Sequence, residues 1–238
     1  MTKSINFEVI GHVRSPYKEK FAIPRQPGLV KAAKGFIELT SPFEHIDMVK
    51  SIEQFSHLWV IFVFHETMEH GWKPLVRPPR LGGNQKVGVL ATRSTFRPNP
   101  IGMSVVKLDD VLCENNEIKL AISGLDLLDN TPILDIKPYI PYADAIDTAM
   151  GGYADEKPMQ LKTVTFSDDA KQVCMQAPSE ENLFTLITQV LSQDPRPAYK
   201  QNKPDSKIYG IRLYHYNITW CINSNSHVEV LHIEKENE

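Results

Sequence analysis

The stretch "VGVLATRSTFRPNPIGMSVVKL" spans residues 87–108 and joins two apolar runs through a polar, proline-rich connection. Residues 87–92 and 103–108 have the composition and spacing of β-strands. The two prolines of the connection fix their own backbone and push the residues before them toward extended conformations. Arg93 and Arg97 lie four residues apart on this stiff segment. Such a stiff connection is typical of a ligand-binding loop. A structural crossover whose arginines bond to buried carbonyls fits the same residues.

Other apolar patterns in the first half also predict strands. They lie at residues 7–13, 35–39, 58–64 and 118–123. Glycine and proline occur in nearly every gap, as in the turns of barrels and sandwiches. The stretch 41–52 predicts a helix, with Ser41 as its N-cap and Pro42 at its first position. We therefore expect a mainly β N-terminal domain, a β-barrel, over residues 1–158.

The pattern changes after the linker-like segment "GGYADEKP", residues 151–158. A strand at 161–166 and a helix at 179–191 with one apolar face follow it. Alternating strand patterns then occur at residues 208–213, 214–221 and 228–233. Residues 159–238 thus predict a small α+β C-terminal domain.

The charge of the chain is locally segregated. The formal net charge is −3, which provides no overall attraction to nucleic acid. Residues 71–108, however, contain seven lysines and arginines and no acidic residue. This cationic strip is either a solvated face or a track for phosphates.

The cysteines and the apolar runs bear on the cellular compartment. Three widely spaced cysteines without a C-x-x-C pair indicate a reducing environment and neither a disulfide framework nor a zinc site. The first twenty residues lack an apolar segment, and the longest apolar run, 58–64, is too short to span a bilayer. We expect a soluble, cytoplasmic protein with no membrane partner.

Four carboxylates lie in or beside apolar residues of the segment 123–144: Asp126, Asp129, Asp135 and Asp144. Carboxylates so placed need partners, because burial of an unpaired charge is costly. Their spacing does not match a calcium loop and no histidine-rich triad accompanies them, so no metal is expected. The usual glycine-rich nucleotide motifs and the common hydrolase motifs are also missing from the sequence, which disfavours a doubly wound cofactor fold.

The motif "DPRPAY", residues 194–199, is followed by Tyr209. A proline-stiffened loop with an arginine and two tyrosines can stack on a base while holding a phosphate. An ordinary connection between a helix and a strand explains the same residues.

Four motifs together resemble the TsaA/TrmO (YaeB-like) family over essentially the whole chain. They are "PRQPGL" at 24–29, residues 91–104, "DNTPILDIKPYIPYAD" at 129–144, and "DPRPAY" with Tyr209-Gly210. The resemblance implies a homodimeric, single-sheeted β-barrel that uses S-adenosylmethionine without a Rossmann-type fold. The implied reaction methylates the exocyclic amino nitrogen of threonylcarbamoyladenosine next to the anticodon of tRNA.

The resemblance also implies a cofactor pocket. Its expected residues are Gln26, Pro27, Gly28, His65, Glu66, Arg93, Met103, Ser123, Gly124, Leu125 and Asp126. Met103 replaces a leucine expected in many relatives, and either residue provides an apolar contact for adenine. Arg93 is expected near the carboxylate of the methyl donor, and Arg97 near RNA or a structural carboxylate such as Asp135.

RNA contacts are expected from Arg77, Arg80, Arg97, Arg196 and Tyr209. The acceptor nitrogen belongs to a urea-like group, whose acidic N–H makes a general base plausible near neutral pH. Asp194, Tyr199, His65 and Asp126 are possible bases; Asp194 and Tyr199 are the predicted catalytic residues because their loop also carries the RNA-facing groups. Apart from the resemblance, a non-catalytic RNA-binding or regulatory barrel that senses a small molecule fits the same features.

Overall fold

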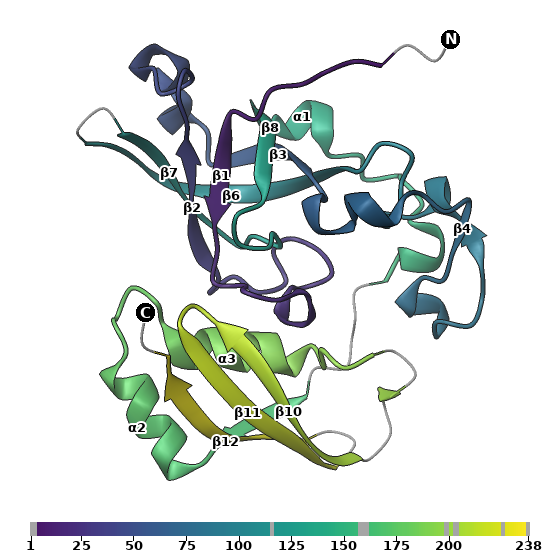
Figure 1. Cartoon of the computed structure of the whole chain (residues 1–238), viewed down its shortest axis with the longest axis vertical. Coiled ribbons are helices and arrows are strands. Elements are labelled where there is room, and N and C mark those ends of the chain that lie inside the picture. Colours follow the sequence, from purple (N-terminus) through teal and green to yellow (C-terminus); the bar gives the residue numbers. More distant parts are fainter. Residues whose placement is uncertain are drawn as a thin grey trace.

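The computed structural model of the chain contains a β-barrel followed by a smaller α+β unit (Figure 1). The structure describes residues 4–114, 117–156, 162–197, 200–201, 205–224 and 227–236. None of the helices in these ranges is long and apolar enough to cross a membrane. The predicted boundary at residue 158 lies outside the described residues and stays a prediction.

Six strands of the described residues close the barrel in the order β1-β2-β7-β6-β3-β8. They are β1 (Gly11–Arg14), β2 (Lys34–Leu39), β3 (His57–Val63), β6 (Ile101–Glu114), β7 (Glu117–Ser123) and β8 (Pro132–Pro138). Every neighbouring pair is antiparallel, and β8 returns to β1 with Gly11 opposite Ile133. The prediction of a mainly β, single-sheeted barrel is confirmed.

The barrel core follows from the two-residue period of its strands. Along β3, the side chains of Leu58, Val60 and Phe62 are buried and the alternate ones are half-buried. Each buried apolar side chain contributes roughly 1.5–3 kcal/mol relative to an exposed one. Gly35 lets β1 and β2 approach, because a Cβ at this position would clash with the carbonyl oxygen of Arg14.

Two local predictions for the barrel region are wrong. The expected helix at 41–52 is a pair of 3-10 helices, η2 (Ile46–Val49) and η3 (Ile52–Gln54), separated by Ser51 in the left-handed conformation. The expected strand at 87–92 is a short β5 (Val87–Gly88), which pairs with β4 (Leu75–Val76) outside the barrel, followed by η6 (Val89–Ala91). The amide and hydroxyl of Thr92 both donate to the Val89 carbonyl and close a turn there.

Short helices occupy several of the connections around the barrel. They are η1 (Lys20–Ala22), η4 (His65–His70), η5 (Pro79–Leu81), α1 (Pro141–Asp144) and η7 (Gly152–Ala154). The segment that carries β4 and η5 extends to one side of the barrel in Figure 1. These connections, rather than the barrel interior, are available to form a site.

The C-terminal unit is a four-stranded sheet with two helices, which confirms the predicted α+β class. The sheet order is β10 (Asp205–Leu213), β11 (Tyr216–Ser224), β12 (His227–Lys235) and β9 (Thr163–Phe166), with β9 parallel to β12. Helix α3 (Leu183–Ser192) buries its apolar face, as its period predicts. Helix α2 (Asp168–Gln176) was not predicted, since Ala170 is its one buried residue.

Hydrogen bonds join the two units. The Ala32 amide donates to Oε1 of Gln189 on α3 at 2.9 Å, and the Tyr214 amide donates to the Pro16 carbonyl at 2.7 Å. Tyr17 is fully buried at this junction and bridges to Leu213. The C-terminal unit is therefore packed against the same barrel end that carries the motif at residues 24–29.

Candidate functional site

A cavity of about 1440 Å³ lies where the barrel connections meet the C-terminal unit. Four sequence-distant predicted residues line it: Gln26 and Arg93 of the cofactor set, and Arg77 and Arg80 of the RNA set. Leucine, valine and proline side chains from the same segments add apolar surface. Its other lining residues include Arg25, Leu29, Val76, Pro78, Pro79, Leu90, Tyr153 and Gln201. The cavity thus combines guanidinium groups and apolar walls with two carboxylates, Asp155 and Glu156, as a site for a ligand with both charged and aromatic parts requires.

Arg93 and Gln26 are in direct contact. Nη1 of Arg93 donates to Oε1 of Gln26 at 2.7 Å, so the motif at 24–29 and the connection after η6 meet in the cavity. The connection is held by its own side chains, because the Ser94 amide donates to Oγ1 of Thr92 at 3.1 Å. This local bonding presents Arg93 from a fixed backbone.

Arg97 takes the structural role that the sequence left open. Its Nη1 donates to the Thr92 carbonyl at 2.7 Å and to the Val89 carbonyl at 3.4 Å. The alternative partner Asp135 forms an ion pair with Lys137 at 2.7 Å. Arg97 therefore stiffens the segment that carries Arg93, and its contact with RNA stays a prediction.

Asp126 is a half-buried carboxylate beside this cluster. Oγ of Ser104 donates to its Oδ1 at 2.6 Å. Burial raises the pKa of Asp126 to about 6, although the hydrogen bond from Ser104, its own amide and the charge of Arg93 act in the opposite direction. Asp126 and Arg93 are thus within electrostatic reach of each other.

Two glycines with left-handed backbone join the loop at 24–29 to the turn that follows β7. Gly28 has φ of 75° and Gly124 has φ of 71°, and the Gly28 amide donates to the Gly124 carbonyl at 2.8 Å. A Cβ at Gly28 would meet no atom within 4 Å, so open space adjoins this backbone. Ser123 ends β7 beside this turn, and Leu125 after it is fully buried in the core. Residues 24–28, 93 and 126 therefore lie in one region, as the sequence predicted.

The other predicted cofactor residues lie outside the lining of this cavity in the described chain. Pro27 belongs to the same loop as Gln26 and is half-buried. His65 and Glu66 begin η4, where Glu66 pairs with Lys20 at 3.4 Å. Met103 lies half-exposed on the outer face of β6. Their contacts with a cofactor stay predictions.

Asp194 and Arg196 form a buried ion pair. Nε and Nη2 of Arg196 donate to the two carboxylate oxygens of Asp194, both at 2.8 Å, and Nζ of Lys162 is 3.9 Å from Oδ2. Nε2 of Gln201 donates to the carbonyls of Asp194 and Arg196, which connects this loop to the cavity wall. The geometry supports a positioning role for Asp194. Its catalytic role stays a prediction, and Tyr199 lies outside the described residues.

Tyr209 belongs to a second network on the C-terminal sheet. Its ring stacks on Trp220 with centroids 4.9 Å apart, and its hydroxyl donates to the carboxylate of Asp205. Lys200 bonds to both groups, and the hydrogen bonds from Tyr209 and Lys200 lower the pKa of Asp205. The proposed stacking of Tyr209 on RNA stays a prediction.

Four residues that shape the site were missed in the sequence: Arg25, Ser104, Tyr153 and Gln201. Arg25 is part of "PRQPGL" and could have been found there. The Tyr153 hydroxyl donates to the Ala91 carbonyl at 3.0 Å and holds one wall. The other residues carry no local signal, since their roles depend on partners far along the chain.

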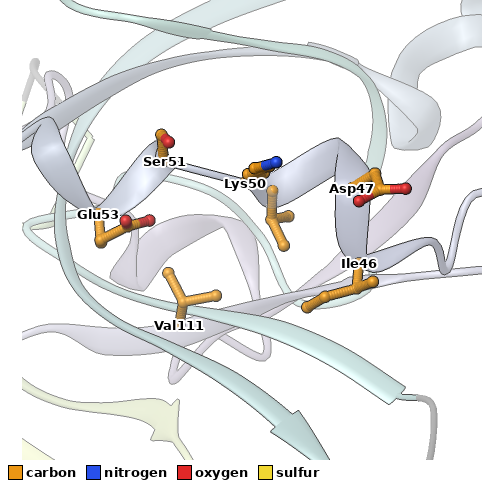
Figure 2. Close-up of a pocket in the computed structure, with 7 residues that line it drawn as sticks. Ile46, Asp47, Lys50, Ser51, Glu53 and Val111 are labelled. Atoms are coloured by element: carbon orange, nitrogen blue, oxygen red, sulfur yellow. The ribbon is translucent and has the colours of Figure 1, made fainter.

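A smaller depression of about 320 Å³ lies between η2, η3 and β6. Figure 2 shows Ile46 and Val111 with apolar side chains, and Asp47, Lys50 and Glu53 with polar ones. None of the residues predicted for the site lines it. Among the residues that the structure describes, no group of three histidine, cysteine or acidic side chains is arranged to hold a metal ion.

Known proteins resemble this chain over nearly its full length. Residues 12–145 match the family model for the tRNA-methyltransferase O N-terminal domain, and residues 158–236 match that for the TrmO C-terminal domain. The tRNA (adenine(37)-N6)-methyltransferase of Escherichia coli K12 is 50% identical over 220 residues, 92% of this chain and 94% of that protein. A Pseudomonas aeruginosa PAO1 protein whose name describes an S-adenosylmethionine-dependent methyltransferase is 46% identical and covers 92% of this chain and 93% of its own. The crystal structure of TrmO from Pseudomonas aeruginosa superposes with a TM-score of 0.79 at 38% identity, covering 98% of this chain and 99% of that one.

Proposed function

Because the chain belongs to the tRNA-methyltransferase O family, we propose that it methylates N6 of adenine 37 in tRNA with S-adenosylmethionine as methyl donor. The target nucleoside that we propose is threonylcarbamoyladenosine. One observation carries the proposal: Gln26 and Arg93 share a cavity with Arg77 and Arg80. A cofactor pocket and a phosphate-binding surface are thereby adjacent, as transfer of a group to RNA requires.

The described residues fit the methyl donor. Arg93 offers a fork of donors for its carboxylate, and the open backbone at Gly28 leaves room beside the turn at Gly124. When bound, S-adenosylmethionine supplies an electrophilic methyl carbon on a sulfonium sulfur. The chain must then hold the acceptor nitrogen in line with this carbon and exclude water, which lowers the barrier through proximity.

Methylation of N6 would release its proton, which a residue of the chain would have to accept. Asp126 is the carboxylate of the cofactor set that Arg93 influences, and with a pKa of about 6 it is ionised at neutral pH and can accept that proton. Both oxygens of Asp194 already accept hydrogen bonds from Arg196. We therefore propose Asp126 as the proton acceptor and Asp194 as the residue that positions Arg196.

Single-turnover kinetics distinguish the role proposed for Asp126 from the role proposed for Asp194. Asp126→Asn should slow methyl transfer by about 10²- to 10⁴-fold, the usual contribution of a general base. Asp194→Asn should weaken tRNA binding more than it slows transfer at saturating tRNA. Equal transfer rates for Asp126→Asn and the parent protein would reject Asp126 as the base, and selective loss of transfer in Asp194→Asn would restore the sequence-based assignment.

The cationic strip supplies sequence-independent contacts to the tRNA. Arg77 and Arg80 line the outer part of the site on the segment with β4 and η5. Guanidinium contacts to phosphates position RNA without reading its sequence. Arg196 and Tyr209 on the C-terminal unit and Arg97 complete the proposed RNA-binding set.

We also propose a homodimer that acts in the cytoplasm, where its tRNA substrate is found. Ile101 and Met103 lie on the outer face of β6 with 38% and 51% of their surface exposed, and Leu90 is 77% exposed. Exposed apolar side chains of this size favour a protein partner. Light scattering after gel filtration measures the mass directly, and a monomer at micromolar concentration would contradict the dimer.

The reaction is tested with purified protein, S-adenosylmethionine and tRNA, followed by mass spectrometry of the nucleosides. We expect one added methyl mass on the threonylcarbamoyl nucleoside and on no other. tRNA from a strain lacking the protein is the matched substrate, and the absence of methylation on that tRNA would refute the proposed function.

A further inference from the structure

Two positively charged side chains of the cavity come from different segments of the chain. Arg25 and Arg80 both line it, one from the barrel loop and one from η5. Desolvation is the main cause that lowers the pKa of Arg25; Asp194 raises it and Arg80 lowers it further. Both arginines are exposed to solvent and stay protonated at neutral pH, so each can bind an anion.

Neither arginine has a carboxylate partner in the described part of the chain. The arginines in ion pairs there are Arg14, Arg196 and Arg212. Arg80 donates a hydrogen bond to a neutral group, from its Nη1 to the Glu156 carbonyl at 2.6 Å. Asp155 and Glu156 also line this open cavity, but neither forms an ion pair with Arg25 or Arg80 among the described residues. Two guanidinium groups without an ion pair in one cavity can bind an anionic ligand group.

The position of Arg25 indicates which anion of the substrate it meets. The next residue, Gln26, bonds to Arg93 at 2.7 Å, so Arg25 adjoins the residues proposed to hold the methyl donor. Phosphates of the RNA backbone are available to Arg77. The threonylcarbamoyl group, in contrast, carries a carboxylate a few bonds from the nitrogen that receives the methyl group.

We propose that Arg25, assisted by Arg80, binds the carboxylate of the threonylcarbamoyl group and makes methylation depend on it. The inference rests on the proposed function and adds the residue that selects the modified base. A planar guanidinium matches a carboxylate through two parallel hydrogen bonds. A site that binds the substrate carboxylate discriminates strongly against an analogue without this carboxylate, because the polar groups of the site are then left unpaired.

The test uses three anticodon stem-loop RNAs that differ at one nucleoside. The first carries threonylcarbamoyladenosine, the second carries its neutral threonine-amide analogue, and the third carries adenosine. For the parent protein we expect kcat/KM for the carboxylate RNA to exceed that for the amide RNA by about 10- to 100-fold. This factor corresponds to the usual contribution of a hydrogen bond to a charged group. For Arg25→Gln this ratio should fall close to one.

Two matched arginine variants identify the anion that is bound. Arg77→Gln should lower kcat/KM for all three RNAs by a common factor, because a phosphate contact does not depend on the base. Arg212→Gln, which removes a surface pair with Glu236 far from the cavity, should leave the ratio unchanged. If Arg25→Gln also lowered kcat/KM for the carboxylate RNA and for the amide RNA by one common factor, Arg25 would bind phosphate and the inference would be wrong.

The inference and the proposed function fail in different ways. A parent protein that methylates the carboxylate and amide RNAs equally keeps the function and overturns the role of Arg25. A parent protein that methylates no adenine refutes the function itself. Thermal unfolding and titration with S-adenosylmethionine show whether Arg25→Gln is folded, and Arg25→Lys, which keeps the charge without the fork, should recover only part of the ratio.

Discussion

Replacement of Asp126 by asparagine tests the electrostatics of the site through folding stability. The pKa of Asp126 is about 6, against an ordinary value of 3.8. A difference of about two pKa units corresponds to about 3 kcal/mol at 1.36 kcal/mol per unit. This free energy is the approximate cost of holding the carboxylate ionised in the folded protein at neutral pH.

The sign follows from proton binding. Between about pH 4 and pH 6 the folded protein keeps a proton on Asp126 that the unfolded chain releases, so this group makes stability fall as pH rises through that window. The amide in Asp126→Asn has no charge to desolvate and keeps an oxygen that accepts from Ser104. The free energy of unfolding of the variant, relative to the parent, should therefore rise by about 2–3 kcal/mol between pH 4 and pH 7.

Urea unfolding at a series of pH values and constant ionic strength measures this difference. Asp47→Asn is the matched control, since its side chain is 75% exposed and its removal should change stability by no more than about 0.5 kcal/mol at any pH. A difference for Asp126→Asn that stays flat with pH, or that falls as pH rises, would refute the account of Asp126 as a desolvated carboxylate.

Three further predictions concern the cofactor, the RNA and the barrel. Arg93→Gln should weaken S-adenosylmethionine binding by about 10- to 100-fold in calorimetric titration, because a charged donor is lost; unchanged affinity would remove Arg93 from the pocket. Arg77→Gln should reduce the slope of log affinity for tRNA against log salt by about one, and an unaltered slope would exclude a phosphate contact at Arg77. Gly35→Ala should destabilise the barrel by about 1–3 kcal/mol in urea unfolding, because the Arg14 carbonyl leaves no room for a methyl group; a neutral effect would show that β1 and β2 can separate at no cost.

Local periodicity was enough to predict five of the six barrel strands and the strands of the C-terminal sheet, whereas β8 (Pro132–Pro138) was not predicted. The run at 58–64 forms β3 and the alternation at 118–123 forms β7. Successive side chains of a strand point to opposite faces of the sheet, so the pattern can be read from neighbouring residues alone. Helix α3 was recognisable for the same reason, although it begins at Leu183 rather than at 179. The failure at 87–92 shows the limit, because an apolar run determines neither which strand a segment joins nor whether it is buried; Leu90 of this run is 77% exposed.

The amino-acid sequence by itself determined the β class of the chain and the α+β character of its last third. Only the tertiary structure decided which partner each charged side chain takes. Arg97 bonds to the carbonyls of its own loop, Asp194 accepts from Arg196, and Arg25 shares a cavity with Arg80 without an ion pair among the described residues. The physical reason is that secondary structure arises from contacts a few residues apart, whereas the charge environment of a side chain sums over groups brought close by the packing of the whole molecule.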